Sequence, residues 1–139
     1  MYYFLSLDFV KDDEMAQTLG AEERLKKQKI IDEIFYKRNS VSKYPVRLLW
    51  TELDEGSPNS QCAFFVPKRY FRHAVDRNRI KRLMREVYRT HRDTYLSHTT
   101  THYAFVLLWN GSDMPSYSTV CTLIDGAFGK WKEKTVVCL

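Results

Sequence analysis

The sequence predicts an α+β fold, a two-layer sandwich in which helices pack against a small, mostly antiparallel sheet. Three observations predict it. The 139 residues are 44% hydrophobic, which suits one domain with its own core. Apolar residues recur at helical spacing in three segments and at strand spacing in three others. The segments follow one another as helix, strand, strand, helix, strand, helix, with no internal repeat.

The N-terminal residues 1–20 differ from the rest of the chain. Their apolar start has no basic flank and turns acidic at Asp12, Asp13 and Glu14, which argues against a signal peptide. We interpret residues 1–20 as an extension that is either disordered or the product of a start codon assigned too early. The folded domain is expected over residues 21–139.

The first half of the domain predicts one helix and two strands. Residues 21–38 carry an apolar stripe that includes Ile31 and Phe35, typical of an amphipathic helix. Residues 45–53 alternate in polarity and residues 61–66 are continuously apolar, and both segments are expected to be strands. The turn-forming composition of residues 54–60 predicts that the two strands pair as an antiparallel hairpin.

The second half predicts two helices around a buried strand. Residues 76–92 contain no Gly or Pro, and Asp76 suits the helix start. A polar loop over residues 98–102 contains two His four residues apart, which we interpret as solvated rather than metal-binding. Residues 103–109 are expected to form a buried strand, and residues 116–134 a final amphipathic helix.

Positive charge is concentrated on the segment that contains the second helix. Residues 68–92 hold ten Lys or Arg against two acids, a local charge of +8 in a chain whose net charge is +5. On a helical wheel the apolar residues fall on one side and most basic residues on the other. A solvated charged face is the alternative, but such faces normally mix signs, and only Glu86 is available for that here. Arg also suits phosphate better than Lys does.

The composition and the motifs that are missing exclude several classes of protein. A sequence pI near 9.1 favours a polyanionic partner. No apolar run reaches about 18 residues, so no membrane span is expected. Three well-separated Cys are interpreted as free thiols of a cytoplasmic protein. The sequence shows no nucleophile elbow, no Gly-rich phosphate loop and no carboxylate cluster suited to Mg²⁺, so the protein alone is not expected to cleave anything.

The basic segment resembles the signature of the bacterial ribonuclease P protein subunit. That signature is a hydrophobic strand, a Lys-Lys or Lys-Arg pair, and then Ala-Val-x-Arg-Asn-x-x-Lys-Arg-x-x-Arg-Glu. Here Lys68-Arg69 follow an apolar strand, and residues 74–86 read AVDRNRIKRLMRE. The resemblance covers roughly residues 23–134 and is weakest in the last helix.

The resemblance implies a fold and a function. The fold is that of the ribonuclease P protein, ribosomal protein S5 domain 2-like, with a further short strand and a left-handed β-α-β crossover. The function is that of the protein subunit of the tRNA-processing endoribonuclease, which binds the catalytic RNA subunit and the 5′ leader of precursor tRNA. The RNA subunit carries catalysis and, with the substrate, holds the Mg²⁺ ions. Neither a membrane nor an obligate protein partner is expected.

The motif also implies site residues. Arg79 projects about 100° away from the basic face, and is interpreted as a cap or ion-pair partner as well as a candidate contact. The leader cleft is expected to take in Ile31 and Phe35 from the first helix. The candidate RNA-binding residues are Lys68, Arg69, Arg72, Arg77, Asn78, Arg79, Lys81, Arg82, Arg85 and Arg89, and the cleft is completed by Asn78, Lys81 and Arg85.

Two departures from the family pattern affect this assignment. Ile31 stands where the family commonly has Phe, which weakens any stacking role there. The loop Tyr70-Phe71-Arg72-His73 is bulkier than in many relatives, which usually have a Gly. Two alternatives stay open, a non-catalytic RNA- or DNA-binding module such as a ribosomal or regulatory protein, and a self-sufficient protein nuclease. The missing carboxylates disfavour the nuclease.

Overall fold

The computed structural model describes residues 24–137 apart from positions 55 and 58. The expected extension over residues 1–20 lies outside the described residues, and its interpretation stays a prediction. The described part is an α+β domain, as the sequence predicts. Its elements, in chain order, are α2 (Gln28–Lys37), β1 (Ser40–Lys43), β2 (Val46–Glu52), β3 (Gln61–Phe65), α3 (Ala74–Leu96), β4 (Tyr103–Trp109) and α4 (Tyr117–Val137).

The four strands form one mixed sheet in the order β1-β2-β4-β3. Strand β4 is buried along its whole length and pairs on both sides, antiparallel to β2 and parallel to β3. The expected hairpin between residues 45–53 and 61–66 is therefore wrong, because β4 lies between the two strands. The composition of residues 54–60 correctly predicted that the chain reverses direction between β2 and β3. It could not predict that β4, which comes later in the chain, lies between them.

Strand β1 is the short strand that the sequence did not reveal. Three of its four residues are polar, and all four are only half-buried or exposed, so the segment lacks strand periodicity. It pairs antiparallel with β2 through a tight turn at Tyr44 and Pro45, whose peptide bond is cis. Helix α2 ends just before it at Arg38, which has a left-handed backbone (φ 56°) and donates its N–H to Ile34 O at 3.1 Å.

The expected helix over residues 21–38 begins late, at Gln28. Among the described residues before it, Arg24 forms an isolated parallel bridge with Cys62, and Leu25 N donates to Cys62 O at 3.2 Å. The segment thus extends the sheet beside β3 before the chain turns into α2. Leu25, an apolar residue within the expected helix range, is therefore buried against the sheet and does not lie on the helix.

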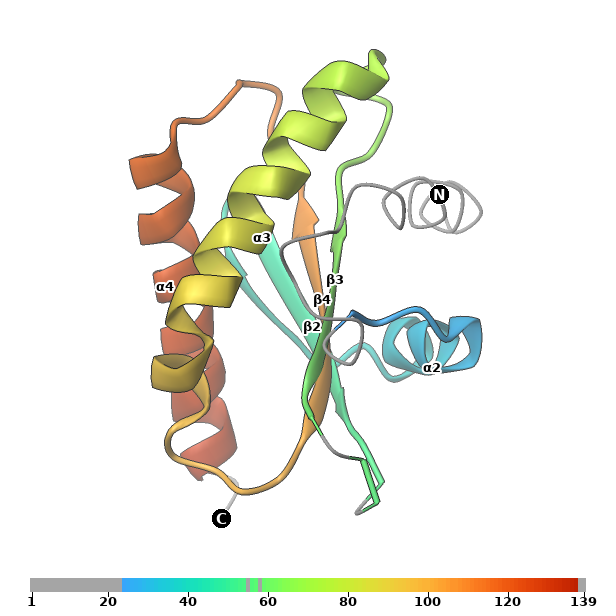
Figure 1. Ribbon diagram of the computed structural model, residues 1–139, viewed down its shortest axis with the longest axis vertical. Coiled ribbons are helices and arrows are strands. Elements are labelled where there is room, and N and C mark those ends of the chain that lie inside the picture. The colour runs from blue at the N-terminus through green and yellow to red at the C-terminus, as the bar shows by residue number, and fades with distance from the viewer. Residues whose placement is uncertain (1–23, 55, 58, 138–139) are drawn as a thin grey trace.

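The connection β3-α3-β4 joins two neighbouring parallel strands through one helix. In Figure 1, β3 lies nearer the viewer than β4, and α3 lies to the left of both, so the crossover is left-handed. Nearly all such crossovers are right-handed, so general rules would have selected the wrong hand. The family resemblance predicted the correct one.

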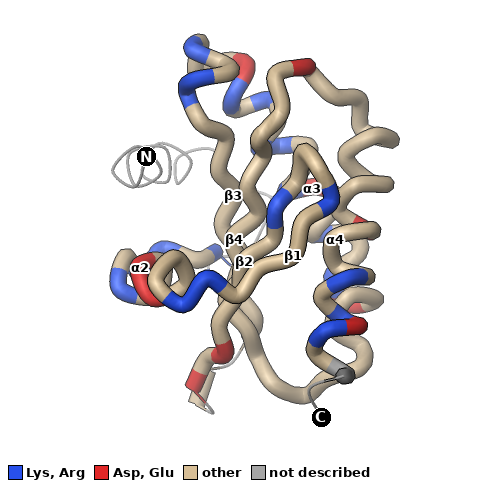
Figure 2. The backbone as a smooth tube through the Cα atoms, turned by 180° about the vertical axis from the view of Figure 1, so that it is seen from behind, with Lys and Arg blue, Asp and Glu red and all other residues tan. Residues whose placement is uncertain are grey.

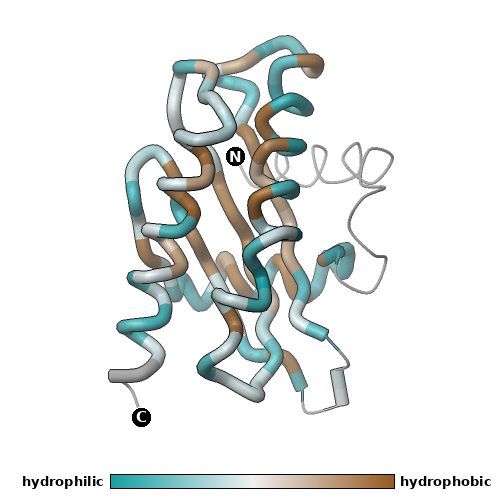
Figure 3. The backbone as a smooth tube through the Cα atoms, turned by 60° about the vertical axis from the view of Figure 1, so that its left-hand side comes forward, coloured by the Kyte–Doolittle hydropathy of each residue, from teal (hydrophilic) through white to brown (hydrophobic). Residues whose placement is uncertain are grey.

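Helices cover both faces of the sheet. Helix α3 packs over β3, and α4 over β1 and β2, on one face, while α2 packs against β2 and β4 on the other. Alternate strand residues supply the two cores: Leu48 and Phe105 point toward α3 and α4, and Leu49 and Val106 point toward α2. Figure 3 shows hydrophobic residues on the strands and on the sides of α3 and α4 that face them.

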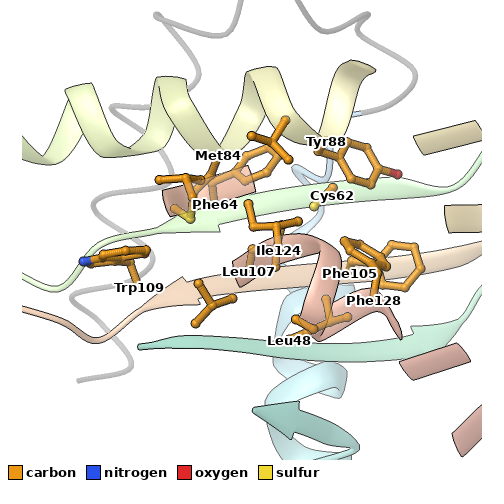
Figure 4. Packing of buried hydrophobic residues seen from close by; sticks show 14 of the residues in the cluster. Leu48, Cys62, Phe64, Met84, Tyr88, Phe105, Leu107, Trp109, Ile124 and Phe128 are labelled. Carbon is orange, nitrogen blue, oxygen red and sulfur yellow. The ribbon is translucent and has the colours of Figure 1, made fainter. Parts of the chain in front are cut away.

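The larger core is rich in aromatic side chains (Figure 4). Tyr88 of α3 packs edge-on against Phe64 of β3, with ring centroids 6.1 Å apart, and burial raises the pKa of its hydroxyl. Phe128 of α4 lies 6.0 Å from Tyr88 and 5.2 Å from Phe105 of β4. These contacts fix α3 on the sheet. None of the described helices combines the length and apolar character needed to cross a membrane.

Candidate nucleic-acid interface

Helix α3 is longer than the sequence predicted and begins two residues earlier, with His73 as its N-cap and Asp76 in its first turn. Its apolar residues Ile80, Met84 and Val87 are fully buried against the sheet, as expected, while Leu83 is only partly buried. The basic residues, in contrast, do not share one environment. They divide into a buried group and an exposed group.

Three of the predicted RNA-binding residues are buried. Arg77, Lys81 and Arg85 follow one another at four-residue intervals and are only 3%, 1% and 2% exposed. The helical wheel places these three on the side opposite the apolar residues, but in the fold they are buried with them. A stripe at four-residue spacing lies beside the apolar stripe, so the buried arc of α3 is wider than its hydrophobic residues indicate.

Arg77 holds the loop that leads into α3. Its Nη1 donates to Phe71 O at 2.8 Å and to Arg72 O at 3.0 Å. Hydrogen bonds from a charged donor are stronger than neutral ones. Arg77 therefore fixes the backbone that carries the exposed side chain of Arg72, and acts as a positioning residue.

The side chain of Arg85 extends from α3 toward the sheet and packs against it rather than pointing into the solvent. Its guanidinium carbon lies 5.6 Å from the centroid of the Phe64 ring, within the range of a cation–π contact. Because Arg85 is buried, replacing it would affect folding as well as any RNA contact. A test of the surface must use exposed residues instead.

The exposed group gathers at the N-terminal end of α3 and the loop before it. We call Arg69, Arg72, Arg79 and Arg82 the basic end, and all four are exposed. None of them forms an ion pair with an acid of the described chain. Figure 2 shows Lys and Arg gathered where β3 leads into α3, whose first turn also contains Asp76. Arg79 forms no ion pair within the part of the chain that the structure describes, and its interpretation as a cap or ion-pair partner stays a prediction.

The helix itself adds to the positive potential of the basic end. The first four N–H groups of a helix have no partner within it, and the peptide dipoles sum to about half a positive charge there. His73 makes no side-chain cap hydrogen bond. A 23-residue helix thus directs its positive end toward the same region as four arginines, and Asp76 in its first turn offsets part of that charge.

The remaining candidates lie at the margins of this region. Lys68 and Asn78 are half-buried, and Arg89 is bound by Glu86 through two nitrogens, one of them at 3.2 Å. The Arg89 hydrogen bond lowers the pKa of the Glu86 carboxyl. Arg89 is therefore already partly neutralised. Arg69 stacks on the exposed ring of Tyr70 at 4.9 Å, which places an aromatic face within the basic end.

Comparison with known proteins connects this surface to a family. The family model described as Ribonuclease P matches residues 19–132, which include the whole of α3 and the basic end. The chain belongs to the ribonuclease P protein family. This confirms the resemblance found in the sequence.

The chain is also similar to individual ribonuclease P proteins. The chain is 37% identical over 76 residues to the ribonuclease P protein component of Chlorobium phaeobacteroides, a match covering 52% of each chain. It is 29% identical over 106 residues to that of Porphyromonas gingivalis, covering 73% of this chain and 77% of the relative. The first match thus spans about half the length of that relative. The solved Staphylococcus aureus RNase P protein has the same fold, with a TM-score of 0.66 at 20% identity, over 79% of this chain and 95% of that one.

The cleft residues expected from the ribonuclease P family do not come together in this chain. Ile31 is a core residue, 2% exposed, on the sheet face that α2 covers, whereas Lys81 and Arg85 lie on α3, which packs on the opposite face. Phe35 is partly buried and lines a shallow hollow of α2 with Lys29 and Tyr36. Helical spacing placed these residues on the right helices, but the sheet between α2 and α3 separates them.

The described residues do not fit the Mg²⁺ that the ribonuclease P family implies. Mg²⁺ prefers an octahedral set of oxygen ligands. Within the described residues, the one group of three close ligands is His91, Cys121 and Asp125, which offers a single carboxylate. The predicted solvated pair also differs from expectation: His98 packs edge-on against Trp131 at 5.1 Å, and burial lowers its pKa.

Proposed function

We propose that this chain is the protein subunit of ribonuclease P. It binds the catalytic RNA subunit and the 5′ leader of precursor tRNA, and assists removal of the leader. The observation that carries the proposal is the family motif folded as α3, with four exposed arginines that have no acidic partner in the described chain at the positive end of the helix.

The basic end would act by neutralising phosphates. RNA segments that approach one another repel through their backbones and hold a layer of counterions. Arginines that replace those counterions release them and gain free energy, and their planar guanidinium groups bind phosphate oxygens in pairs. Arg77 would contribute indirectly, because it holds the loop that carries Arg72. The exposed ring of Tyr70 could accept an unpaired base by stacking.

Catalysis is assigned to the RNA subunit. The described side chains offer no oxygen-ligand cluster suited to Mg²⁺, so we propose that the RNA and its substrate hold the metal ions. The protein's part is then to raise the affinity of the RNA subunit for its substrate. Phe35 stays a candidate for contact with the leader, although the hollow that it lines with Lys29 and Tyr36 also contains the acids Asp32 and Glu33. The cytoplasmic location and the absence of an obligate protein partner stay predictions.

Equilibrium binding tests this proposal against the rival of a general nucleic-acid-binding module. We expect the chain to bind a bacterial ribonuclease P RNA at least about tenfold more tightly than an unrelated structured RNA of the same length, at the same salt concentration. In complex with that RNA, it is expected to favour precursor tRNA over mature tRNA. Equal affinity for both RNAs and for duplex DNA at every salt concentration would support the rival.

A further inference from the structure

A cluster of metal-binding residue types lies between α3 and α4, away from the basic end. His91 comes from α3, and Cys121 and Asp125 come from α4, one turn apart. One ligand atom from each lies within 4.8 Å of the other two. Cys121 and His91 are half-buried, and Asp125 is exposed, so the cluster is open to the solvent on one side. The two helices pack side by side here (Figure 1).

The spacing within the cluster approaches that of a tetrahedral metal site. Metal–sulfur and metal–oxygen bonds of about 2.3 and 2.0 Å, at a tetrahedral angle, place the two ligand atoms about 3.5 Å apart. Cys121 Sγ and Asp125 Oδ2 are 3.7 Å apart. This pair is therefore already close to its coordinating distance before any ion arrives. One ring nitrogen of His91 lies within 4.8 Å of both atoms, so His91 is placed to supply the third ligand.

The neighbours of the cluster orient its ligands. His91 Nδ1 lies 3.0 Å from Val87 O, and as the donor in that hydrogen bond it leaves Nε2 free to coordinate. Tyr95, one turn after His91, donates its hydroxyl to Asp125 Oδ1, which leaves Oδ2 for a metal. Outer contacts of this kind, from a backbone carbonyl to His and from a donor to a carboxylate, hold metal ligands in place.

We propose that His91, Cys121 and Asp125 form a binding site for a zinc-class transition-metal ion, with water in the fourth position. Thiolate, imidazole and one carboxylate are a borderline-soft donor set, which selects Zn²⁺ or Co²⁺ over Mg²⁺ and Ca²⁺. The Cys121 thiol loses its proton to the solvent as the metal–sulfur bond forms. The bound ion joins α3 to α4, so its effect is to stabilise the folded domain.

This site is independent of RNA binding by the basic end. His91 lies nine residues after Arg82, the nearest member of the basic end on the same helix, which is about 14 Å at 1.5 Å per residue. Metal binding and RNA binding are therefore expected to respond to different substitutions. The proposal of a Zn²⁺ site does not depend on the proposed ribonuclease P function, so an experiment that contradicts one leaves the other unaffected.

The test uses the whole chain with Cys138→Ser, so that Cys62 and Cys121 are the remaining thiols. Cys62 is 2% exposed in the core and is not available to an ion. We expect Zn²⁺ to raise the melting temperature by several degrees over the metal-free protein, and Mg²⁺ at the same concentration to leave it unchanged. Co²⁺ is expected to bind one to one and to give the thiolate-to-metal absorption band of a cysteine ligand.

Single substitutions then assign the ligands. Cys121→Ser, His91→Gln and Asp125→Asn are each expected to weaken Zn²⁺ binding at least about tenfold, and Cys121→Ser should abolish the thiolate band. His102→Gln, which changes a half-buried histidine outside the cluster, is the matched control and should bind as the parent does. Comparing each variant with and without metal separates ligand loss from any change in folding. No Zn²⁺-dependent shift in the parent, or a Co²⁺ thiolate band that survives Cys121→Ser, would overturn the proposal.

Discussion

Trp131→Ala is expected to destabilise the domain by about 3–5 kcal/mol, a large part of the 5–15 kcal/mol that holds a typical domain folded. The indole is 0% exposed. It packs edge-on against Tyr103 and Phe105 of β4, each with ring centroids 5.1 Å away, and lies 5.9 Å from Phe128. Removing it opens a cavity where α4 meets the central strand. Urea unfolding followed by circular dichroism measures the change.

Tyr36→Ala is the matched control for this prediction. It removes an aromatic ring that is 87% exposed on α2, and is expected to change stability by no more than about 0.5 kcal/mol. If Trp131→Ala cost as little as Tyr36→Ala, α4 would not rest on the sheet through this residue.

The double substitution Arg79→Ala and Arg82→Ala is expected to weaken RNA binding strongly without loss of stability. Both side chains are exposed, and neither pairs with an acid of the described chain. Each phosphate that the protein no longer neutralises should reduce the slope of log affinity against log salt by about 1, so the slope of the double variant should fall by about 2. The measurement is a salt titration of affinity for ribonuclease P RNA, beside a melting curve.

Lys130→Ala with Lys132→Ala removes the same charge from the exposed surface of α4. If affinity depended on net charge alone, this control would change the slope as much as the arginine pair does. We expect it to change the slope much less. An unchanged slope for the arginine pair would show that the basic end does not contact RNA.

Periodicity predicted most of the elements because their buried faces are apolar. Strand β4 and helix α4 appear within a few residues of their expected limits, since Tyr103–Trp109 presents hydrophobic residues to both cores and Tyr117–Val137 to the larger one. Strand β1 could not be predicted, because Val41 is its one apolar residue and its pairing with β2 is made mainly through the backbone. The strand order also depends on contacts between distant segments, which no local pattern encodes.

The candidate site was predicted less completely than the fold. Helical spacing assigned the basic residues to α3, but it could not separate buried Lys81 and Arg85 from exposed Arg82, since burial depends on what the helix packs against. The i,i+4 pair Cys121 and Asp125 was visible in the sequence. Its third member, His91, lies 30 residues earlier, and only the packing of α3 against α4 brings it close.

Reconstituted cleavage tests the central claim most directly. Precursor tRNA is incubated at low Mg²⁺ with the purified chain alone, with bacterial ribonuclease P RNA alone, and with both. We expect the chain alone to leave the substrate intact, the RNA alone to cleave poorly, and the mixture to cleave efficiently at the mature 5′ end. Cleavage by the RNA-free chain, or a mixture no faster than the RNA alone, would contradict the assignment of this chain as the protein subunit of ribonuclease P.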